Sequence, residues 1–290
     1  MSRRGSGLLL FVALVSFSGA FGQSSVTPVQ LTFTTIDVPG AAFTGIYGIN
    51  SFGDMVGNYG WNTNSGSHGF LYRNGTFIYF DYPGQNRTFP TGINDSGLIV
   101  GSAGNLRVVG FLFDGATFTP IRKGNDSATF SFGINNAEDI VGGAGTVGST
   151  TAFKLRSGTF KDLMTPGQNV YAYATGINNL GQIVGWTDYD GFQCRGNQCQ
   201  TIDFPGAAMT EAEGINDSGI VVGWYNPSSS TDFAFAFYRG KYISFSVPSA
   251  AGTYALGINA SGQIVGEYTF DHDSYHGFVT SPISSTVFDF

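Results

Sequence analysis

One ten-residue pattern occurs six times along the chain, and this repeat constrains the fold more strongly than any other feature. Each copy reads Gly-Ile-Asn, two variable residues, a turn residue, another variable residue, and an apolar residue followed by Val-Gly. Consecutive copies start 38 to 44 residues apart. Internal repeats of this length are typical of solenoids and propellers, in which each repeat is one supersecondary unit. The copies begin at Gly48, Gly92, Gly133, Gly176, Gly214 and Gly257.

The pattern predicts a β-hairpin. Gly-Ile ends one strand, Asn opens a tight turn, and the turn glycine supplies a residue with positive φ. The Val-Gly pair then belongs to the next strand. The third copy has Glu138 in place of the turn glycine, so we expect its turn to be distorted or of another type.

A second recurring element, Gly or Ala followed by Phe, predicts a third strand after each copy. Its first example is Gly69-Phe70, and Asn74-Gly75 is a strong turn signal into a fourth strand. We label the four strands of each repeat a to d, with Gly-Ile-Asn closing strand a. Four short strands in about 42 residues are typical of a propeller blade. The sequence therefore predicts an all-β fold, a six-bladed β-propeller with four antiparallel strands per blade, as a single domain over residues 23–290.

Both ends of the chain offer a strand d for the last blade. Segments like strand d occur seven times if Leu31–Asp37 and Thr286–Phe290 are both counted, whereas strands a, b and c occur six times. One end therefore completes the last blade, and the other is left as a fifth or loosely attached strand.

The motif Gly-Ile-Asn-x-x-Gly-x-Ile-Val-Gly, followed by Gly/Ala-Phe, resembles the HAF-repeat family of extracellular bacterial proteins. The resemblance covers nearly all of residues 31–290. It implies export and a repeat architecture, and it brings no established activity or catalytic residue. His68 and His276 directly precede Gly-Phe, at the histidine position of the family's repeat, so the resemblance assigns them to the repeat.

Residues 1–22 have the order of a secretory signal peptide: Arg3 and Arg4, then the apolar run Leu8–Phe17, then small residues up to Gly22. We expect cleavage after Gly22 and a mature protein that is secreted, or held at the cell surface or in the periplasm. The alternative is a retained membrane anchor, but the apolar run is too short to span a bilayer. No other stretch approaches spanning length.

The charge of the chain argues against one class of partner. The formal net charge is −7, and loss of two of the 13 basic residues with the leader makes it −9. Nucleic-acid binding needs clusters of Lys and Arg, so we expect no nucleic-acid partner. The sequence has no nucleotide-binding loop, zinc signature, haem motif or Ser-His-Asp order. We therefore expect no cofactor, apart from calcium as considered below. The expected oligomeric state is a monomer.

The two cysteines form the segment Cys194-Arg-Gly-Asn-Gln-Cys199. A turn at Gly196-Asn197 would make Arg195 and Gln198 its closing pair, so Cys194 and Cys199 would face each other across a hairpin. This position predicts a disulfide, which suits an oxidising compartment. A metal-binding pair is the alternative, but no second Cys or His cluster accompanies it.

Departures from the repeat mark candidate site residues on one face. In a propeller the d–a and b–c connections emerge on the same face, and here the b–c connections vary most in length. Variable loops on a rigid scaffold often carry binding groups. The ligand-binding candidates on this d–a/b–c face are Arg87, Trp186, Asp188, Asp190, Glu211, Glu213, Trp224, Asp271, His272 and Asp273.

Two of these residue types suggest binding. Trp186 and Trp224 follow strand b and can stack on a ligand, although aromatic residues at repeat positions commonly pack between blades. The Asp-x-Asp pairs at 188–190 and 271–273 supply the oxygens that Ca²⁺ prefers, although such loops are commonly only solvated. The metal question is open at this point.

The acidic residues of strand a suggest catalysis as an alternative. Three residues before Gly-Ile-Asn the other repeats mostly have aromatic residues, whereas the fifth has Glu211, and Glu213 points to the same side of the strand. The pair could act as general acid and base. Glu211, Glu213 and His272 are the catalytic candidates, although a histidine in a surface loop is commonly incidental.

Three classes of function are compatible with these residues. The favoured class is a non-enzymatic extracellular or surface binding module with a glycan or protein ligand. The second is an extracellular polysaccharide hydrolase or lyase that uses carboxylates on the d–a/b–c face. The third is a purely structural or outer-membrane-associated protein.

Overall fold

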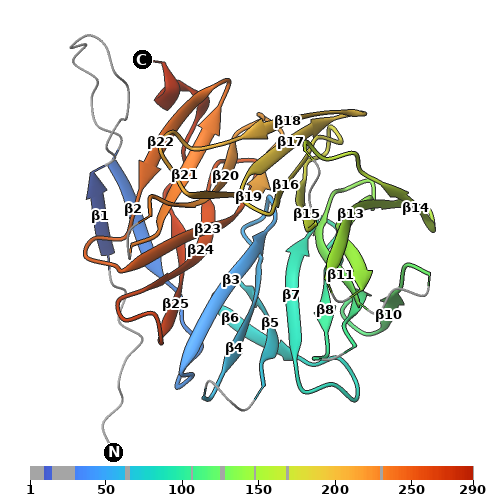
Figure 1. The fold of residues 1–290 in the computed structure, drawn as a ribbon. Helices are drawn as coiled ribbons and strands as arrows, with labels where there is room; N and C mark the ends of the chain where they lie inside the picture. Colours follow the sequence, from blue (N-terminus) through green and yellow to red (C-terminus); the bar gives the residue numbers. More distant parts are fainter. Residues whose placement is uncertain are drawn as a thin grey trace, which may run out of the picture.

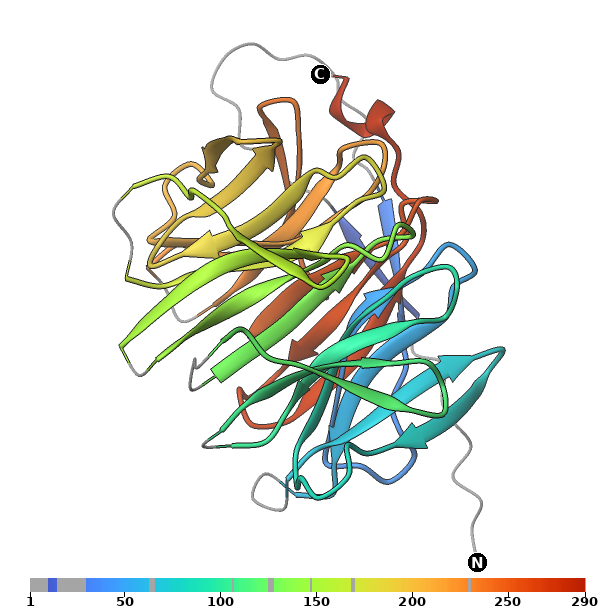
Figure 2. The same cartoon turned by 90° about the vertical axis from the view of Figure 1, so that its right-hand side faces the viewer.

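The computed structural model describes residues 10–14, 30–62, 66–105, 107–124, 128–146, 148–167, 170–228 and 231–289. Six antiparallel sheets are arranged around a common axis, as Figures 1 and 2 show. The innermost strands of neighbouring sheets contact one another all the way round, and β23 of the last sheet contacts β3 of the first. The predicted six-bladed β-propeller is confirmed.

The first three blades follow the predicted order of strands a to d. In blade 1 the strands are β3 (Phe43–Ile49), β4 (Met55–Gly60), β5 (His68–Arg73) and β6 (Thr76–Phe80). In blade 2 they are β7 (Thr88–Ile93), β8 (Ile99–Ala103), β9 (Val109–Phe113) and β10 (Phe118–Ile121). In blade 3 they are β11 (Ala128–Ile134), β12 (Ile140–Thr146), β13 (Ser149–Arg156) and β14 (Thr159–Asp162).

Blades 4 and 5 follow the same order of strands a to d, whereas blade 6 takes its strand d from the N-terminal part of the chain. Blade 4 has β15 (Ala172–Ile177), β16 (Ile183–Thr187), β17 (Gly191–Arg195) and β18 (Gln198–Ile202). Blade 5 has β19 (Met209–Ile215), β20 (Val221–Asn226), β21 (Phe233–Tyr238) and β22 (Lys241–Phe245). Blade 6 has β23 (Gly252–Ile258), β24 (Ile264–Thr269), β25 (Tyr275–Thr280) and, as strand d, β2 (Gln30–Thr35).

The N-terminal strand closes the ring. β2 pairs antiparallel with β25, with Phe33 opposite Thr280. The other candidate, Thr286–Phe290, is not a strand over its described residues: it begins in a 3₁₀ helix, η1 (Ser285–Phe288). The Phe288 ring packs against Tyr238, and Lys241 Nζ donates a hydrogen bond to the Phe288 carbonyl at 2.9 Å. Burial of Phe288 against blade 5 thus replaces strand pairing at this end.

The structure describes five residues of the expected leader. Leu10–Leu14 forms β1, which pairs with the outer edge of β2 (Figure 1). Because β1 is the outermost strand of its sheet, cleavage of the leader would leave the four strands of blade 6 in place. The expected cleavage site at Gly22 lies outside the described residues. Among the described residues, no helix is long and apolar enough to cross a membrane.

The two sequence elements recur together because they pack on each other. The Phe of each Gly/Ala-Phe element is fully buried, and it lies over the glycine of the Val-Gly pair. At Gly57 a Cβ atom would collide with the Gly45 carbonyl and with the Phe70 ring. The six buried rings are those of Phe70, Phe111, Phe153, Phe192, Phe235 and Phe278.

The asparagine of Gly-Ile-Asn links each blade to the next. Its Oδ1 accepts amide hydrogen bonds from its own turn, for example from Asp54 N to Asn50 Oδ1 at 2.9 Å. Its Nδ2 donates to the carbonyl of the asparagine in the following blade, at 2.9 to 3.3 Å. Asn259 Nδ2 donates to the Asn50 carbonyl, so the hydrogen bonds form a closed ring. The sequence predicted only the turn function of this residue.

The expectation that Glu138 distorts its turn is wrong. Glu138 adopts a φ of 61°, close to the 75–86° of the glycines at the same position in the other blades. The turn hydrogen bonds are also the same: Glu138 N donates to Asn135 O at 3.1 Å, as Gly53 N does to Asn50 O. The closed asparagine ring fixes this turn, so the glutamate accepts a left-handed backbone conformation.

We therefore expect Glu138→Gly to stabilise the protein by about 1 kcal/mol, because a non-glycine residue at positive φ costs about 1 to 2 kcal/mol. The Glu138 side chain is exposed, so its loss removes little packing. Thermal unfolding of the two proteins measures the difference. A lower melting temperature for the variant would show that the left-handed conformation is not strained.

The disulfide prediction is confirmed with its register. Cys194 and Cys199 are bonded and lie opposite each other in the β17–β18 hairpin, and Arg195 and Gln198 close the turn. Cys194 is buried while the turn is exposed. The bond therefore anchors an exposed hairpin tip to the interior of blade 4.

Candidate ligand site in the central cavity

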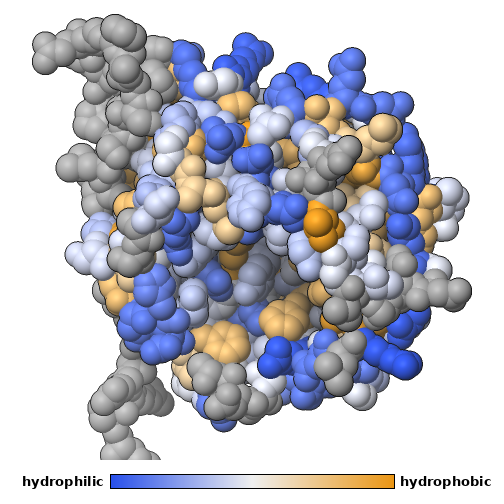
Figure 3. Space-filling view, viewed as in Figure 1, coloured by the Kyte–Doolittle hydropathy of each residue, from blue (hydrophilic) through white to orange (hydrophobic). Residues whose placement is uncertain are grey.

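A cavity of about 570 Å³ opens at the mouth of the central channel on the d–a/b–c face, where Figure 3 shows a hollow. Gly104, Asn105 and Val108 of a b–c connection and Arg87 of a d–a connection contribute to its rim. Arg87 is exposed there. Volumes of about 300 to 1,000 Å³ are usual for small-molecule sites, so the channel mouth is large enough to hold a ligand.

The alternation of strand a supplies most of the lining. Residues three and one before each Gly-Ile-Asn point into the channel, because side chains two apart in a strand share a face. The outer set is Gly45, Phe89, Phe130, Tyr173, Glu211 and Tyr254, of which all but Gly45 and Tyr254 line the cavity. The residues of the inner set all line the cavity: Tyr47, Thr91, Phe132, Thr175, Glu213 and Leu256.

Blades 3 and 4 form a continuous aromatic wall. The Phe130 and Phe132 rings are stacked with centroids 6.1 Å apart, and the Tyr173 ring is edge-to-face with both, at a centroid distance of 6.0 Å from each. The Trp186 ring is 4.5 Å from Tyr173 and is only half-buried. Trp186 therefore lines the cavity with a half-buried ring, and its role in stacking on a ligand stays a prediction.

Blade 5 contributes a hydrogen-bonded pair of carboxyl groups beside this wall. The Glu211 and Glu213 side chains hydrogen-bond to each other, and Trp224 hydrogen-bonds to both. Burial raises the pKa of Glu211 to about 7, and burial together with the neighbouring Glu211 raises the pKa of Glu213 well above its usual value. Two carboxyl groups in contact cannot both be ionised at low cost, so the pair holds a proton near neutral pH.

A third carboxyl group, Glu267 of β24, was missed by the sequence analysis. The Tyr47 hydroxyl donates to Glu267 Oε2 at 3.4 Å. Burial raises the pKa of Glu267 to about 7, although the hydrogen bond from Tyr47 lowers it. A Cβ at Gly45 would collide with the Glu267 carboxyl, so the glycine at this otherwise mostly aromatic position makes room for the acid.

A sequence signal for Glu267 existed. It directly follows Val-Gly, and Trp186 and Trp224 occupy the same position in blades 4 and 5. This position lies opposite the outer set of strand a: Trp186 pairs with Tyr173, Trp224 with Glu211, and Glu267 with Tyr254. In these three blades the residue after Val-Gly therefore lies on the same side of the sheet as the outer set of strand a.

Outside the cavity lining, the acidic region continues at Tyr254, which does not itself line the cavity. Its hydroxyl donates to Asp232 Oδ2 at 2.6 Å, and Asn226 Nδ2 donates to Asp232 Oδ1 at the same distance. Burial, followed by Asp232, raises the pKa of Tyr254 well above its usual value. In the described parts of the chain, no Lys, Arg or His forms an ion pair with Glu211, Glu213 or Glu267.

The first Asp-x-Asp pair does not converge on the cavity. Asp188 accepts hydrogen bonds from Val170 N and Tyr171 N, both at 3.0 Å, and so fastens a b–c loop to a d–a segment. Burial, followed by the nearby Asp203 carboxylate, raises the pKa of Asp190. Neither aspartate lines the cavity.

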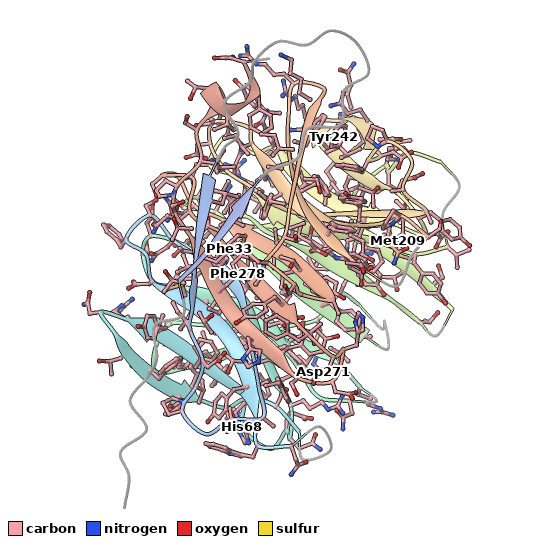
Figure 4. All side chains as sticks on the ribbon, turned by 90° about the vertical axis from the view of Figure 1, so that its left-hand side faces the viewer. Phe33, His68, Met209, Tyr242, Asp271 and Phe278 are labelled. Atoms are coloured by element: carbon pink, nitrogen blue, oxygen red, sulfur yellow. A yellow bond between two sulfur atoms is a disulfide. The ribbon has the colours of Figure 1, made fainter. Side chains whose placement is uncertain are left out.

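The second pair also lies outside the cavity lining, at the outer end of β24 (Figure 4). Asp271 Oδ1 accepts the amides of Asp273 and Ser274 at 2.9 and 2.8 Å. The hydrogen bonds from the Ser274 and Asp273 amides lower the pKa of Asp271 to about 2. His272 has a φ of 62° and its amide donates to Thr269 Oγ1. These residues shape their own loop, and any contact with a ligand stays a prediction.

Two further observations concern metals and histidines. Within the described residues, no group of three or more His, Cys, Asp or Glu side chains could hold a metal ion. The repeat histidines pair with the aspartate that follows strand d of the same blade: His68 Nδ1 lies 2.8 Å from Asp81, and His276 Nδ1 lies 2.8 Å from Asp37. Both pairs lie between strands of one blade, as expected for repeat residues.

Comparison with known proteins identifies the fold alone. No family model and no curated protein sequence matches the chain. Among solved structures, a candidate gluconolactonase matches 83% of this chain and 90% of its own with 12% identity and a TM-score of 0.52. The protein U3-55K matches 96% of this chain and 97% of its own with 9% identity and a TM-score of 0.51.

Proposed function

We propose that the chain is an exported, non-enzymatic binding module of the HAF-repeat family that holds part of an extracellular glycan in its central cavity. The observation that carries the proposal is one cavity of about 570 Å³ with an aromatic wall on one side and hydrogen-bonding carboxyl groups on the next blade. The disulfide between Cys194 and Cys199 supports an oxidising compartment. The module acts as a monomer.

A glycan suits this combination of walls. The Tyr173 and Trp186 rings offer flat apolar faces, against which the C–H face of a sugar ring can stack. Carboxyl oxygens of Glu211 and Glu213 accept hydrogen bonds, which sugar hydroxyls can donate. Thr91, Ser102 and Thr175 add hydroxyl groups to the lining. The cavity can therefore pair both the apolar and the polar surface of a sugar.

The geometry favours binding over the two-carboxylate hydrolysis that is the alternative. Glycosidases keep their two carboxyl groups about 5 to 9.5 Å apart, so that the scissile bond of the sugar, and in inverting enzymes also a water molecule, fits between them. Glu211 and Glu213 are instead in hydrogen-bond contact, which leaves no such space between them. One observation supports the hydrolase: Glu211 keeps a proton near neutral pH, as a general acid must.

We expect a glycan array probed with the mature protein to reveal a ligand. The double variant Glu211→Gln, Glu213→Gln should bind that ligand about tenfold more weakly or worse, because hydrogen bonds to charged groups are lost. Asp273→Asn removes the same kind of charge from an exposed loop outside the cavity and should bind normally.

Two outcomes would contradict the proposal. Undiminished binding by the correctly folded double variant would place the site elsewhere, for example on the opposite face with its similar turns. Release of reducing ends from the bound glycan, lost in Glu211→Gln, would establish the hydrolase instead.

A further inference from the structure

Within the described part of the chain, the carboxyl groups in and next to the central cavity lack a cationic counterpart: Glu211 and Glu213 line the cavity, whereas Glu267 lies outside its lining. Glu211, Glu213 and Glu267 lie on neighbouring blades 5 and 6, and none of them has a cationic partner among the described side chains. Among the described residues that line the cavity, Arg87 is the one basic residue, but it is exposed at the rim of blade 2, three blades away from Glu211. Buried carboxyl groups are costly unless they are protonated or paired. A ligand with a positive charge would supply the missing partner.

The wall next to the carboxyl groups also suits a cation. β15 of blade 4 contacts β19 of blade 5, so the aromatic wall that ends at Tyr173 and Trp186 adjoins Glu211. Aromatic faces attract ammonium groups through the ring quadrupole, most strongly for Trp. An organic ammonium group at this place would therefore gain both a cation–π contact with the aromatic surface and charge pairing with the carboxyl groups.

The carboxyl pair has a defined place for such a group. Glu211 and Glu213 are in hydrogen-bond contact, which requires one of the two carboxyl groups to carry a proton, and Trp224 hydrogen-bonds to both. An ammonium group carries three N–H donors and can donate to both carboxylates at once. The proton of the pair then leaves to solvent, and charge-assisted hydrogen bonds take its place.

We infer that the glycan bound in the central cavity contains an amino sugar, whose ammonium group binds between Glu211 and Glu213. This inference rests on the proposed function, because it names the chemical class of the glycan for the same cavity. The sugar ring stacks on the aromatic wall while its amine faces the carboxyl pair.

The groups around the pair reinforce this choice. Glu211 faces Trp224 on β20 and is close enough to Asp232 for that carboxylate to raise its pKa. Burial raises the pKa of Tyr47 on β3, and the nearby Glu267 and Glu213 carboxyl groups both raise it further. The third carboxyl group, Glu267, therefore belongs to the same acidic region. Among the described residues, the charged groups that shift the pKa of either member of the pair are acidic, and each of them attracts a cation at this place.

The test uses three disaccharides that differ at one substituent. The β1,4-linked glucosamine disaccharide carries free amines, its N-acetylated form carries neutral amides, and cellobiose carries hydroxyls. Calorimetric titration is done at about pH 6, where an aliphatic amine is protonated. We expect the glucosamine disaccharide to bind at least about tenfold more tightly than cellobiose, and to release a proton that shows as a dependence of the heat on the buffer.

Variants locate the effect. Glu211→Gln should abolish the preference for the amine, and Glu213→Gln serves as a second variant if the first is unstable. Asp273→Asn is the matched control and should keep the preference. Raising the salt concentration should weaken binding of the glucosamine disaccharide and leave that of cellobiose nearly unchanged, because only the former depends on charge.

The outcomes separate the inference from the proposed function. If cellobiose or the N-acetylated disaccharide binds as tightly as the amine, the inference is wrong and the glycan-binding function stands. The same holds if an amine preference persists in both glutamine variants, or if only glycans without amines bind on the array. If no glycan binds at all, both are wrong.

Discussion

Replacing Glu267 with glutamine is expected to stabilise the protein at pH 8 by up to about 3 kcal/mol and to leave its stability at about pH 4.5 nearly unchanged. Burial raises the pKa of Glu267 from 4.5 to about 7, and each unit corresponds to about 1.4 kcal/mol. The folded protein thus holds the proton more tightly than the unfolded chain. The free energy of unfolding therefore falls as the pH rises from about 4.5 to 7, and a neutral amide removes that dependence.

Several other groups with a raised pKa act in the same direction. Raised pKa values at Glu211 and Glu213 also make the wild-type protein less stable at pH 8 than at pH 5. So does His276, whose hydrogen bond to Asp37 raises its pKa. Asp271, with its lowered pKa, loses its contribution only below about pH 4, outside this range.

Denaturant unfolding at several pH values measures the effect of Glu267→Gln. The exposed Asp273→Asn variant should follow the wild-type profile at all of them. A Glu267→Gln protein that is less stable than wild type at pH 8 would mean that the carboxylate is ionised there and stabilised by its surroundings.

Phe33→Ala is expected to destabilise the mature protein by about 3 to 5 kcal/mol, the usual cost of removing a buried phenylalanine ring. Phe33 is fully buried in β2, with its ring centroid 5.3 Å from that of Phe278 and 6.3 Å from that of Phe245. Figure 4 shows Phe33 and Phe278 side by side on neighbouring strands. The ring therefore fixes the N-terminal strand to blade 6, where the propeller closes.

Chemical unfolding of chains that begin at Gln23 tests this closure. Beginning the chain at Gln30 instead should change stability little, because β2 is retained. Beginning it at Val38 removes β2 and should cost at least as much as Phe33→Ala. A Phe33→Ala cost below about 1 kcal/mol would mean that the N-terminal strand does not close the ring.

Local repetition explains why the blades could be predicted from the sequence. The Val-Gly and Gly/Ala-Phe elements recur because a glycine under each buried ring is sterically required, as at Gly57 beneath Phe70. Ring closure could not be predicted in the same way. It depends on whether β2 or the C-terminal segment pairs with β25, a contact between residues more than 240 apart in sequence. Both ends carried suitable strand patterns.

The site was predicted in part for a similar reason. Trp186, Glu211 and Glu213 line the cavity. The shared side of Glu211 and Glu213 could be predicted because side chains two residues apart in a strand lie on the same face. Glu267 was missed because its position is recognised only by comparing the residue after Val-Gly across blades. Asp188 and Asp271 have the composition of cation-binding loops, but their carboxylates accept hydrogen bonds from nearby backbone amides. The composition of such a loop does not show whether its carboxylates bind a cation or accept hydrogen bonds from the backbone of the loop.

The central claim is that the ligand is held in the cavity against the aromatic wall, and Trp186 tests it most directly. Trp186→Ala removes the half-exposed ring beside Tyr173, whereas Trp61→Ala removes a more exposed tryptophan of blade 1 that does not line the cavity. The measurement is the dissociation constant of the best glycan from the array for both variants. Loss of one aromatic stacking partner should weaken binding about tenfold. We predict this loss for Trp186→Ala and wild-type affinity for Trp61→Ala. Unchanged affinity in Trp186→Ala, or an equal loss in both, would contradict a site in the central cavity.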